Sequence, residues 1–269
     1  MATFFEEIYK TYYKLNVEWA DPRVQNYFLI GSPFPLLGLL FFYVYFVFKL
    51  GPNLMKNREP FKIDKILVIF NISQIFICSV LVIQYLRRVL FVYNFFCEPI
   101  DYSDEETAVE VTQYVWLYFM IKLVDLLDTV FFVLRKKYNQ ITFLHMYHHI
   151  GMCILTWVGT KYVAGGHGIF LGFINSFVHV IMYFYYLLTA WDEKYKRNVW
   201  WKKHLTQLQI FQFLWIAVHF LFVLIQPNCK YPRWPALTLM PFNILLFALF
   251  TNFYIKAYVK PKRSIQKSD

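Results

Sequence analysis

Seven apolar stretches, each long enough to cross a bilayer, limit what this chain can fold into more than any other feature. They cover residues 27–48, 66–86, 112–134, 141–160, 169–188, 205–225 and 236–258. A helix needs about 20 largely apolar residues to span the hydrocarbon core, and it satisfies its backbone polar groups internally. Only 16% of the residues are charged, whereas soluble domains average about 25%. The sequence therefore predicts an all-α membrane protein with seven transmembrane helices.

Between the apolar stretches the chain has only short polar segments, so one membrane domain accounts for nearly all of it. We expect residues 1–26 to form an amphipathic lead-in, residues 27–258 to form the seven-span domain, and residues 259–269 to form a basic tail. The first 26 residues lack the apolar core of a cleavable signal peptide.

The basic residues are distributed unevenly between the two sides of the predicted bundle. Of the 27 Lys and Arg residues, 18 fall in the connections after the first, third and fifth spans and in the C-terminal region, and eight fall on the other side. Cytoplasmic loops carry the excess of Lys and Arg, so we expect the C-terminus in the cytosol and the N-terminus in a lumen. These loops also explain the net charge of +10. Because no nucleic-acid-binding motif accompanies that charge, we expect no nucleic-acid partner.

Polar and charged side chains interrupt several predicted spans. A charge at the bilayer centre costs about 2.5–3.5 kcal/mol, so such residues are expected to face the interior of the bundle. They are Lys122, Asp125 and Asp128 in the third span, Asn175, His179 and Tyr183 in the fifth, and Gln209 and Gln212 in the sixth. The charged stripe could fix the helix register as an internal ion pair or contact a substrate, and both interpretations stay open. The two glutamines favour hydrogen bonding between helices.

A cluster of histidines is the most distinctive motif. His145, His148 and His149 stand at i, i+3 and i+4, so a helix places all three rings on one face. His179 on the next span is expected to join them. Ionisable side chains inside a membrane indicate a function by default.

Two kinds of chemistry suit this cluster. Histidines at this spacing can bind a metal, as in membrane di-iron desaturases and hydroxylases, although those enzymes use several such clusters and this chain has one. Alternatively, a desolvated imidazole stays neutral and can act as a nucleophile for acyl transfer while neighbouring rings move protons. A seven-helix transporter or receptor would explain the spans but not the histidines.

Two of the four cysteines fall outside the predicted spans. Cys97 and Cys229 lie in connections on the side opposite the basic loops. That side is oxidising in the secretory pathway, which favours a disulfide between them over two free thiols.

Ordered motifs along nearly the whole chain resemble those of the very-long-chain fatty acid elongases, the ELO family of 3-oxoacyl-CoA synthases. The motifs are Lys122-Leu-Val-Asp-Leu-Leu-Asp followed by His145-x-x-His148-His149, then Asn175-x-x-x-His179-x-x-Met182-Tyr183, and Thr206-x-Leu-Gln209-x-x-Gln212. The resemblance implies an enzyme of the endoplasmic reticulum membrane that condenses a long-chain acyl-CoA with malonyl-CoA. It further implies that spans 2–7 surround an enclosed acyl tunnel and that no metal or other cofactor is needed.

The resemblance also implies roles for individual residues. His148 would attack the thioester, assisted by His145, His149 and His179, and Asn175 would donate to an oxyanion. The polar residues named above inside the spans would contact substrate. Basic side chains at the cytosolic mouth would bind the phosphates of CoA: Arg135, Lys136, Lys137, Lys202 and Lys203. Further expected partners are the lipid bilayer and the other enzymes of the elongation cycle, and a homodimer stays open.

Overall fold

The computed structural model describes residues 2–91, 93–192, 194–195 and 199–260, and all regular elements in these ranges are helical. The predicted all-α class is therefore confirmed. The helices are α1 (Ala2–Tyr13), α2 (Pro33–Tyr45), α3 (Gly51–Met55), α4 (Asp64–Phe91), α5 (Glu106–Val124), α6 (Leu127–Leu134), α7 (Phe143–Tyr162), α8 (Ile169–Trp191), α9 (Val199–Ile225) and α10 (Arg233–Tyr254). π-Helical turns at Lys14–Glu18, Phe46–Leu50 and Ile255–Val259 extend α1, α2 and α10.

Within the described ranges, five helical segments are long and apolar enough to cross a membrane. They are Pro33–Met55, Asp64–Arg88, Gly166–Trp191, Trp200–Ile225 and Arg233–Val259. They identify a multi-pass membrane protein. The two remaining predicted spans, 112–134 and 141–160, correspond to helices α5–α6 and α7, which carry the charged stripe and the histidines.

The expectation of one continuous helix over residues 112–134 was wrong. Helix α5 ends at Val124, a turn follows at Asp125 and Leu126, and α6 begins at Leu127. The Asp125 backbone N–H still donates to Ile121 O at 2.8 Å, but the Asp128 N–H donates only three residues back, to Asp125 O at 3.2 Å. No Pro or Gly marks this break in the sequence. It coincides with the buried carboxylate of Asp125, which binds Lys122 of the preceding turn and the distant residues Gln74 and Tyr183.

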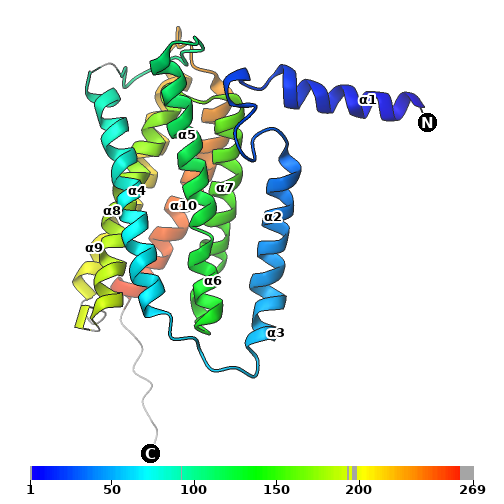
Figure 1. Ribbon diagram of the computed structural model, residues 1–269. Coiled ribbons are helices and arrows are strands. Elements are labelled where there is room, and N and C mark those ends of the chain that lie inside the picture. The colour runs from blue at the N-terminus through cyan, green and yellow to red at the C-terminus, as the bar shows by residue number, and fades with distance from the viewer. Residues whose placement is uncertain (1, 92, 193, 196–198, 261–269) are drawn as a thin grey trace, which may run out of the picture.

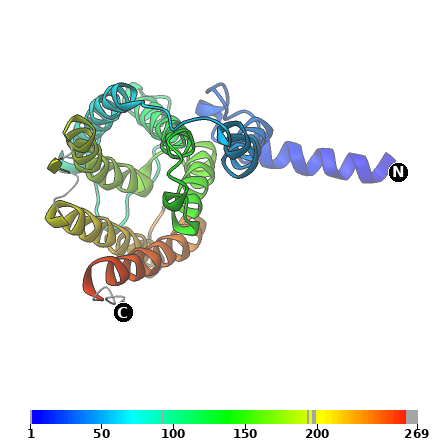
Figure 2. The same cartoon turned by 90° about the horizontal axis from the view of Figure 1, so that it is seen from below.

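Helices α4, α8, α9, α10, α7 and α5 contact one another in that cyclic order, and they form a ring when seen along the bundle axis (Figure 2). Helix α2 lies outside the ring, beside α6 and α7 (Figure 1). Helix α2 is thus a peripheral span, and the six helices of the ring enclose the interior.

The segment before α2 attaches this peripheral span to the ring. Side chains of α5 and α7 donate hydrogen bonds to its successive carbonyl oxygens: Trp116 to Phe28 at 3.1 Å, Trp157 to Leu29 at 2.8 Å, and Lys161 to Ile30 at 2.9 Å and to Gly31 at 3.4 Å. Leu29 adopts a positive φ of 68°, which is uncommon for a residue with a branched side chain. The donors hold the backbone in this conformation.

A disulfide closes one end of the bundle. Cys97 and Cys229 are bonded, with Cα atoms 5.6 Å apart, so the α4–α5 connection is tied to the α9–α10 connection. The predicted pairing is confirmed. Cys78 and Cys153 are buried free thiols, as their positions inside apolar stretches indicated.

Replacing Lys161 with Ala should loosen the first span. The buried ammonium group donates to the buried carbonyl oxygen of Ile30 and to that of the exposed Gly31, and a buried acceptor left without a donor costs about 1–3 kcal/mol. We expect a lower midpoint of thermal unfolding in detergent. Lys10→Ala, at an exposed ion pair with Glu6, serves as the control and should change the midpoint little. Equal midpoints for the two variants would contradict the role of Lys161.

Candidate active site

Three histidines occupy the first turns of α7. The side chain of Thr142 caps this helix by accepting a hydrogen bond from the His145 N–H at 3.2 Å. The ring centroids of His145 and His149 are 4.3 Å apart, and those of His148 and His149 are 5.3 Å apart. The helical spacing therefore brings the three imidazoles into one cluster.

A hydroxyl chain orients His145. Its Nε2 atom lies 2.7 Å from Thr129 Oγ1, and the hydroxyl of Tyr43 donates to the same oxygen at 2.6 Å. Thr129 and Tyr43 are buried. Sequence reasoning missed both of them. Thr129 directly follows Asp128 in the charged stripe, which was a usable signal, whereas Tyr43 comes from the peripheral span and carried none.

The carboxylate of Asp125 is the centre of a second network. Its side chain lies 2.9 Å from Lys122 Nζ, in an ion pair that is almost fully buried. It also accepts hydrogen bonds from Gln74 at 2.5 Å and from the hydroxyl of Tyr183 at 2.9 Å. The same hydroxyl lies 2.9 Å from Asp128, but it has one proton and donates to only one carboxylate at a time. The break between α5 and α6 thus places the charged stripe in contact with α4 and α8.

His179 on α8 approaches this network. Its Nδ1 atom is 3.7 Å from Asp125 Oδ2, beyond hydrogen-bond distance, and has no hydrogen-bond partner in the described part of the chain. Its ring packs edge-on against that of Tyr183, with centroids 5.6 Å apart. His179 is therefore next to Asp125 at the helix break and to Tyr183 on its own helix.

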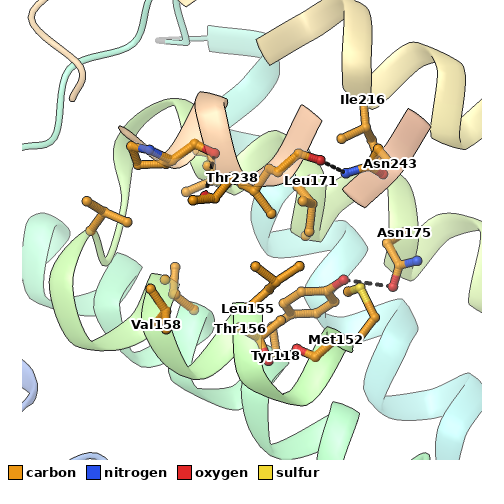
Figure 3. A pocket seen from close by; sticks show the side chains of 18 of the residues that line it. Tyr118, Met152, Leu155, Thr156, Val158, Leu171, Asn175, Ile216, Thr238 and Asn243 are labelled. Carbon is orange, nitrogen blue, oxygen red and sulfur yellow. Dashed lines mark hydrogen bonds between the residues drawn. The ribbon is translucent and has the colours of Figure 1, made fainter. Parts of the chain in front are cut away.

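A cavity of about 80 Å³ lies beyond the histidines along α7, toward the disulfide-linked loops, because its lining includes Met152 and Val163 of this segment and Tyr231 near Cys229. Figure 3 shows side chains of its wall. Its wall is mostly apolar, and Phe213, which lines it, has its ring centroid 6.2 Å from that of His148. Three amides interrupt the apolar wall: Asn175, Gln212 and Asn243. Asn175 Oδ1 accepts a hydrogen bond from the hydroxyl of Tyr118 at 2.8 Å, and this bond fixes the orientation of the amide. The NH₂ group of Asn175 is then available to donate to a bound molecule.

The predicted basic residues lie at the opposite end of the bundle, where α6 ends and α9 begins (Figure 1). Arg135 is 3.5 Å from Asp64, and Lys136 has a positive φ of 53°. Lys202 and Lys203 are half-buried in the first turns of α9. Of the two predicted glutamines, Gln212 lines the cavity, whereas Gln209 donates to the sulfur of Met182 at 3.6 Å.

The arrangement of donor atoms suits acid–base and acyl-transfer chemistry. In the described ranges, no three His, Cys, Asp or Glu side chains converge as metal ligands would. His145 instead bonds a hydroxyl group, and the Asp125 carboxylate is occupied by Lys122 and neutral donors.

The sequence of this chain is similar to those of a family of known proteins. The model of a family described as ELO, GNS1/SUR4 family, matches residues 28–266. Very long chain fatty acid elongase 7 of Rattus norvegicus is 41% identical over 250 residues, which cover 91% of this chain and 88% of the relative. Very long chain fatty acid elongase 4 of Homo sapiens is 41% identical over 94% of this chain and 80% of its own length. Very long chain fatty acid elongase 1 of Mus musculus is 38% identical over 96% and 93% of the two chains.

Removing one partner of the Lys122–Asp125 pair should destabilise the protein strongly. Lys122→Met leaves a buried carboxylate without its cation, which typically costs about 3–5 kcal/mol. Asp125→Asn leaves the cation unpaired but keeps an oxygen for Gln74 and Tyr183.

The double variant Lys122→Met/Asp125→Asn tests whether the two charges are coupled. It removes both charges, so it should be less destabilised than the sum of the single variants. Thermal unfolding of all four proteins in the same detergent measures the coupling. Strictly additive losses would show that the ion pair does not carry the stability of this network.

Proposed function

This chain belongs to the ELO (GNS1/SUR4) family, and from that premise we propose that it is the condensing enzyme of very-long-chain fatty acid elongation. It joins a long-chain acyl-CoA to malonyl-CoA and gives 3-oxoacyl-CoA, CO₂ and free CoA. The observation that supports this reaction most directly is the half-buried histidine cluster of α7, with His148 beside the wall of an apolar cavity. Neither a di-iron oxygenase nor a transporter is favoured by the relatives.

In the first step, a ring nitrogen of His148 attacks the carbonyl carbon of the acyl thioester. A C–N bond forms, the C–S bond breaks, and CoA leaves with the proton that the imidazole gives up. The product is an acyl-imidazole. The rings of Phe213 and Phe250 beside His148 would limit the access of water to this intermediate and so slow its hydrolysis.

In the second step, malonyl-CoA loses CO₂, and the electron pair of the broken C–C bond attacks the acyl carbonyl carbon. The new C–C bond forms as the acyl–nitrogen bond breaks, and His148 takes up one proton. His149, whose ring lies 5.3 Å from that of His148, would deliver that proton, and His145 lies next to His149 and is held in place by Thr129. The free NH₂ group of Asn175 would stabilise the oxyanion, and His179 would be oriented by the Asp125 network.

The two ends of the bundle suit the two ends of an acyl-CoA. The acyl chain would enter the apolar cavity, as part of a tunnel enclosed by spans 2–7. The phosphates of CoA would meet the basic end through Arg135, Lys136, Lys137, Lys202 and Lys203. Lys122, Asp125, Asp128, Tyr183, Gln209 and Gln212 would line or support the space between. The reaction as proposed uses malonyl-CoA as co-substrate and no resident cofactor.

The membrane arrangement completes the proposal. We infer seven spans in the endoplasmic reticulum membrane, with the disulfide in the lumen and the C-terminus in the cytosol. The lead-in 1–26 precedes the domain 27–258, and most of the basic tail 259–269 lies outside the described residues. Other enzymes of the elongation cycle, and a second copy of this chain, are the proposed partners.

His148→Ala should abolish condensation because the acyl-imidazole cannot form. The measurement is release of ¹⁴CO₂ from carboxyl-labelled malonyl-CoA in the presence of a long-chain acyl-CoA, and thermal unfolding checks that the variant is folded. His204→Ala is the control, since this exposed histidine hydrogen-bonds to Gln207 and packs against Trp200, away from the cluster of α7, and its removal should leave activity unchanged. Condensation at the wild-type rate by a folded His148→Ala protein would overturn the mechanism.

A bulky side chain at Gly159 should shorten the products. Gly159 lines the cavity, and a Cβ atom there meets no atom within 4 Å, so Leu can project into the open space. We expect kcat/KM to fall about tenfold or more for the longest acyl-CoA that the wild type uses, and less for shorter ones. Gly38→Leu is the matched control because Gly38 has equal space but lies on α2, outside the ring. An unchanged product profile for Gly159→Leu would contradict acyl binding in this cavity.

A further inference from the structure

Helix α1 stands apart from the bundle. It extends from the end of the bundle where the disulfide-linked loops lie. In the side view of Figure 1 it runs away from the bundle, across the direction of the long helices, and in Figure 2 it points outward from the ring. All of its residues from 3 to 10 are exposed. If the long helices cross the bilayer, a helix perpendicular to them at this level runs parallel to the membrane surface.

The two sides of α1 differ in character. Phe4, Phe5, Ile8 and Tyr12 share one side at helical spacing, and the first three are 65%, 64% and 50% exposed. The opposite side carries Glu6, Glu7, Lys10 and Lys14, with an ion pair of 2.8 Å between Lys10 and Glu6. This pattern is typical of helices that lie in the interface of a bilayer.

The contacts of Tyr12 fix the direction in which the apolar side faces. The hydroxyl of Tyr12 donates to Ser32 Oγ at 3.2 Å, and its ring stacks on Phe34 with centroids 5.9 Å apart. Ser32 caps α2 and Phe34 lies in its first turn, so the apolar side of α1 faces the side on which the spans lie.

The outer surface of α2 continues this apolar side. Leu37 is 52% exposed and Phe41 is 77% exposed, as expected for side chains in contact with lipid. The exposed residues of α1 and α2 thus form one apolar surface that changes direction where Tyr12 meets Phe34. A bilayer, with its hydrocarbon core beside α2 and its headgroup layer beneath α1, matches this shape.

We propose that α1 is an interfacial helix that lies in the lipid headgroup layer, on the membrane face that carries the Cys97–Cys229 disulfide. Phe4, Phe5 and Ile8 insert among the upper parts of the acyl chains, while the charged side faces water. Tyr9 and Trp19, both exposed, add aromatic side chains that favour this depth. The helix thereby anchors the peripheral span α2 from the membrane surface. This inference rests on the membrane-spanning fold and not on the condensing activity.

Spin labels at two adjacent positions test the proposal. Phe5→Cys and Glu6→Cys place nitroxides about 100° apart around α1, one on its apolar side and one on its charged side. The full-length protein is reconstituted into phosphatidylcholine nanodiscs without reduction of the disulfide. Collisions with oxygen report lipid, and collisions with a water-soluble nickel chelate report solvent. Leu37→Cys on α2 gives the lipid reference. The unsubstituted protein gives the background from the buried cysteines Cys78 and Cys153.

We expect the Phe5 label to resemble the Leu37 label, with oxygen collisions dominant, and the Glu6 label to collide mainly with the nickel chelate. Equal access of both labels to the nickel chelate would place α1 in water and overturn the proposal. Protection of the Phe5 label from both reagents would also overturn it, because the apolar side would then be covered by protein, such as a second copy of this chain. Condensation activity of the labelled variants is measured separately, so loss of the proposed function would not be mistaken for loss of the interfacial position.

Discussion

The buried charge of Asp125 is the interaction on which the interior of this protein depends. A carboxylate in the middle of a membrane bundle is stable only if cations and hydrogen-bond donors replace water around it. Lys122 supplies the cation from the preceding turn, Gln74 supplies an amide from α4, and Tyr183 supplies a hydroxyl from α8. One side chain therefore fixes the relative positions of three helices, and it does so at the point where α5 gives way to α6. Their alignment positions His179 on α8 and Thr129 on α6, and Thr129 in turn orients His145.

The rest of the ring divides into a polar and an apolar half. The histidines and the charged network lie toward the basic end, whereas the cavity beyond His148 is walled mainly by apolar side chains toward the disulfide-linked end. In the proposed reaction, this division separates the reactive carbonyl from the hydrocarbon chain attached to it. Phe213 belongs to both halves, because it lines the cavity and packs against the ring of His148.

The features that the sequence predicted are those with a local cause. Helical class, the shared face of His145, His148 and His149, and the disulfide between Cys97 and Cys229 follow from composition, spacing and loop placement. The features that it missed arise from contacts between distant segments. The turn at Asp125 contains no Pro or Gly by which the sequence would predict it. Tyr43 donates a hydrogen bond to Thr129, which is 86 residues away in the chain. The same holds for Lys161, which is buried at the end of α7 because backbone carbonyls of the segment before α2 accept its hydrogen bonds.

The distribution of partners around Asp125 bears on how the protein is made. Gln74 precedes the carboxylate in the chain, but Tyr183 is synthesised nearly 60 residues later. During translation the segment that contains Asp125 therefore reaches the membrane before its surroundings are complete, with only Lys122 and Gln74 present to offset its charge. Such a segment gains little by entering lipid alone, and it would remain near the insertion machinery, or shielded by α4, until α8 arrives. Insertion of this fold into the membrane is thus cooperative, because α8, which is synthesised late, stabilises the earlier segment that contains Asp125. A mutation in α8 that leaves the side chains of the candidate active site unchanged could therefore still reduce the yield of inserted protein.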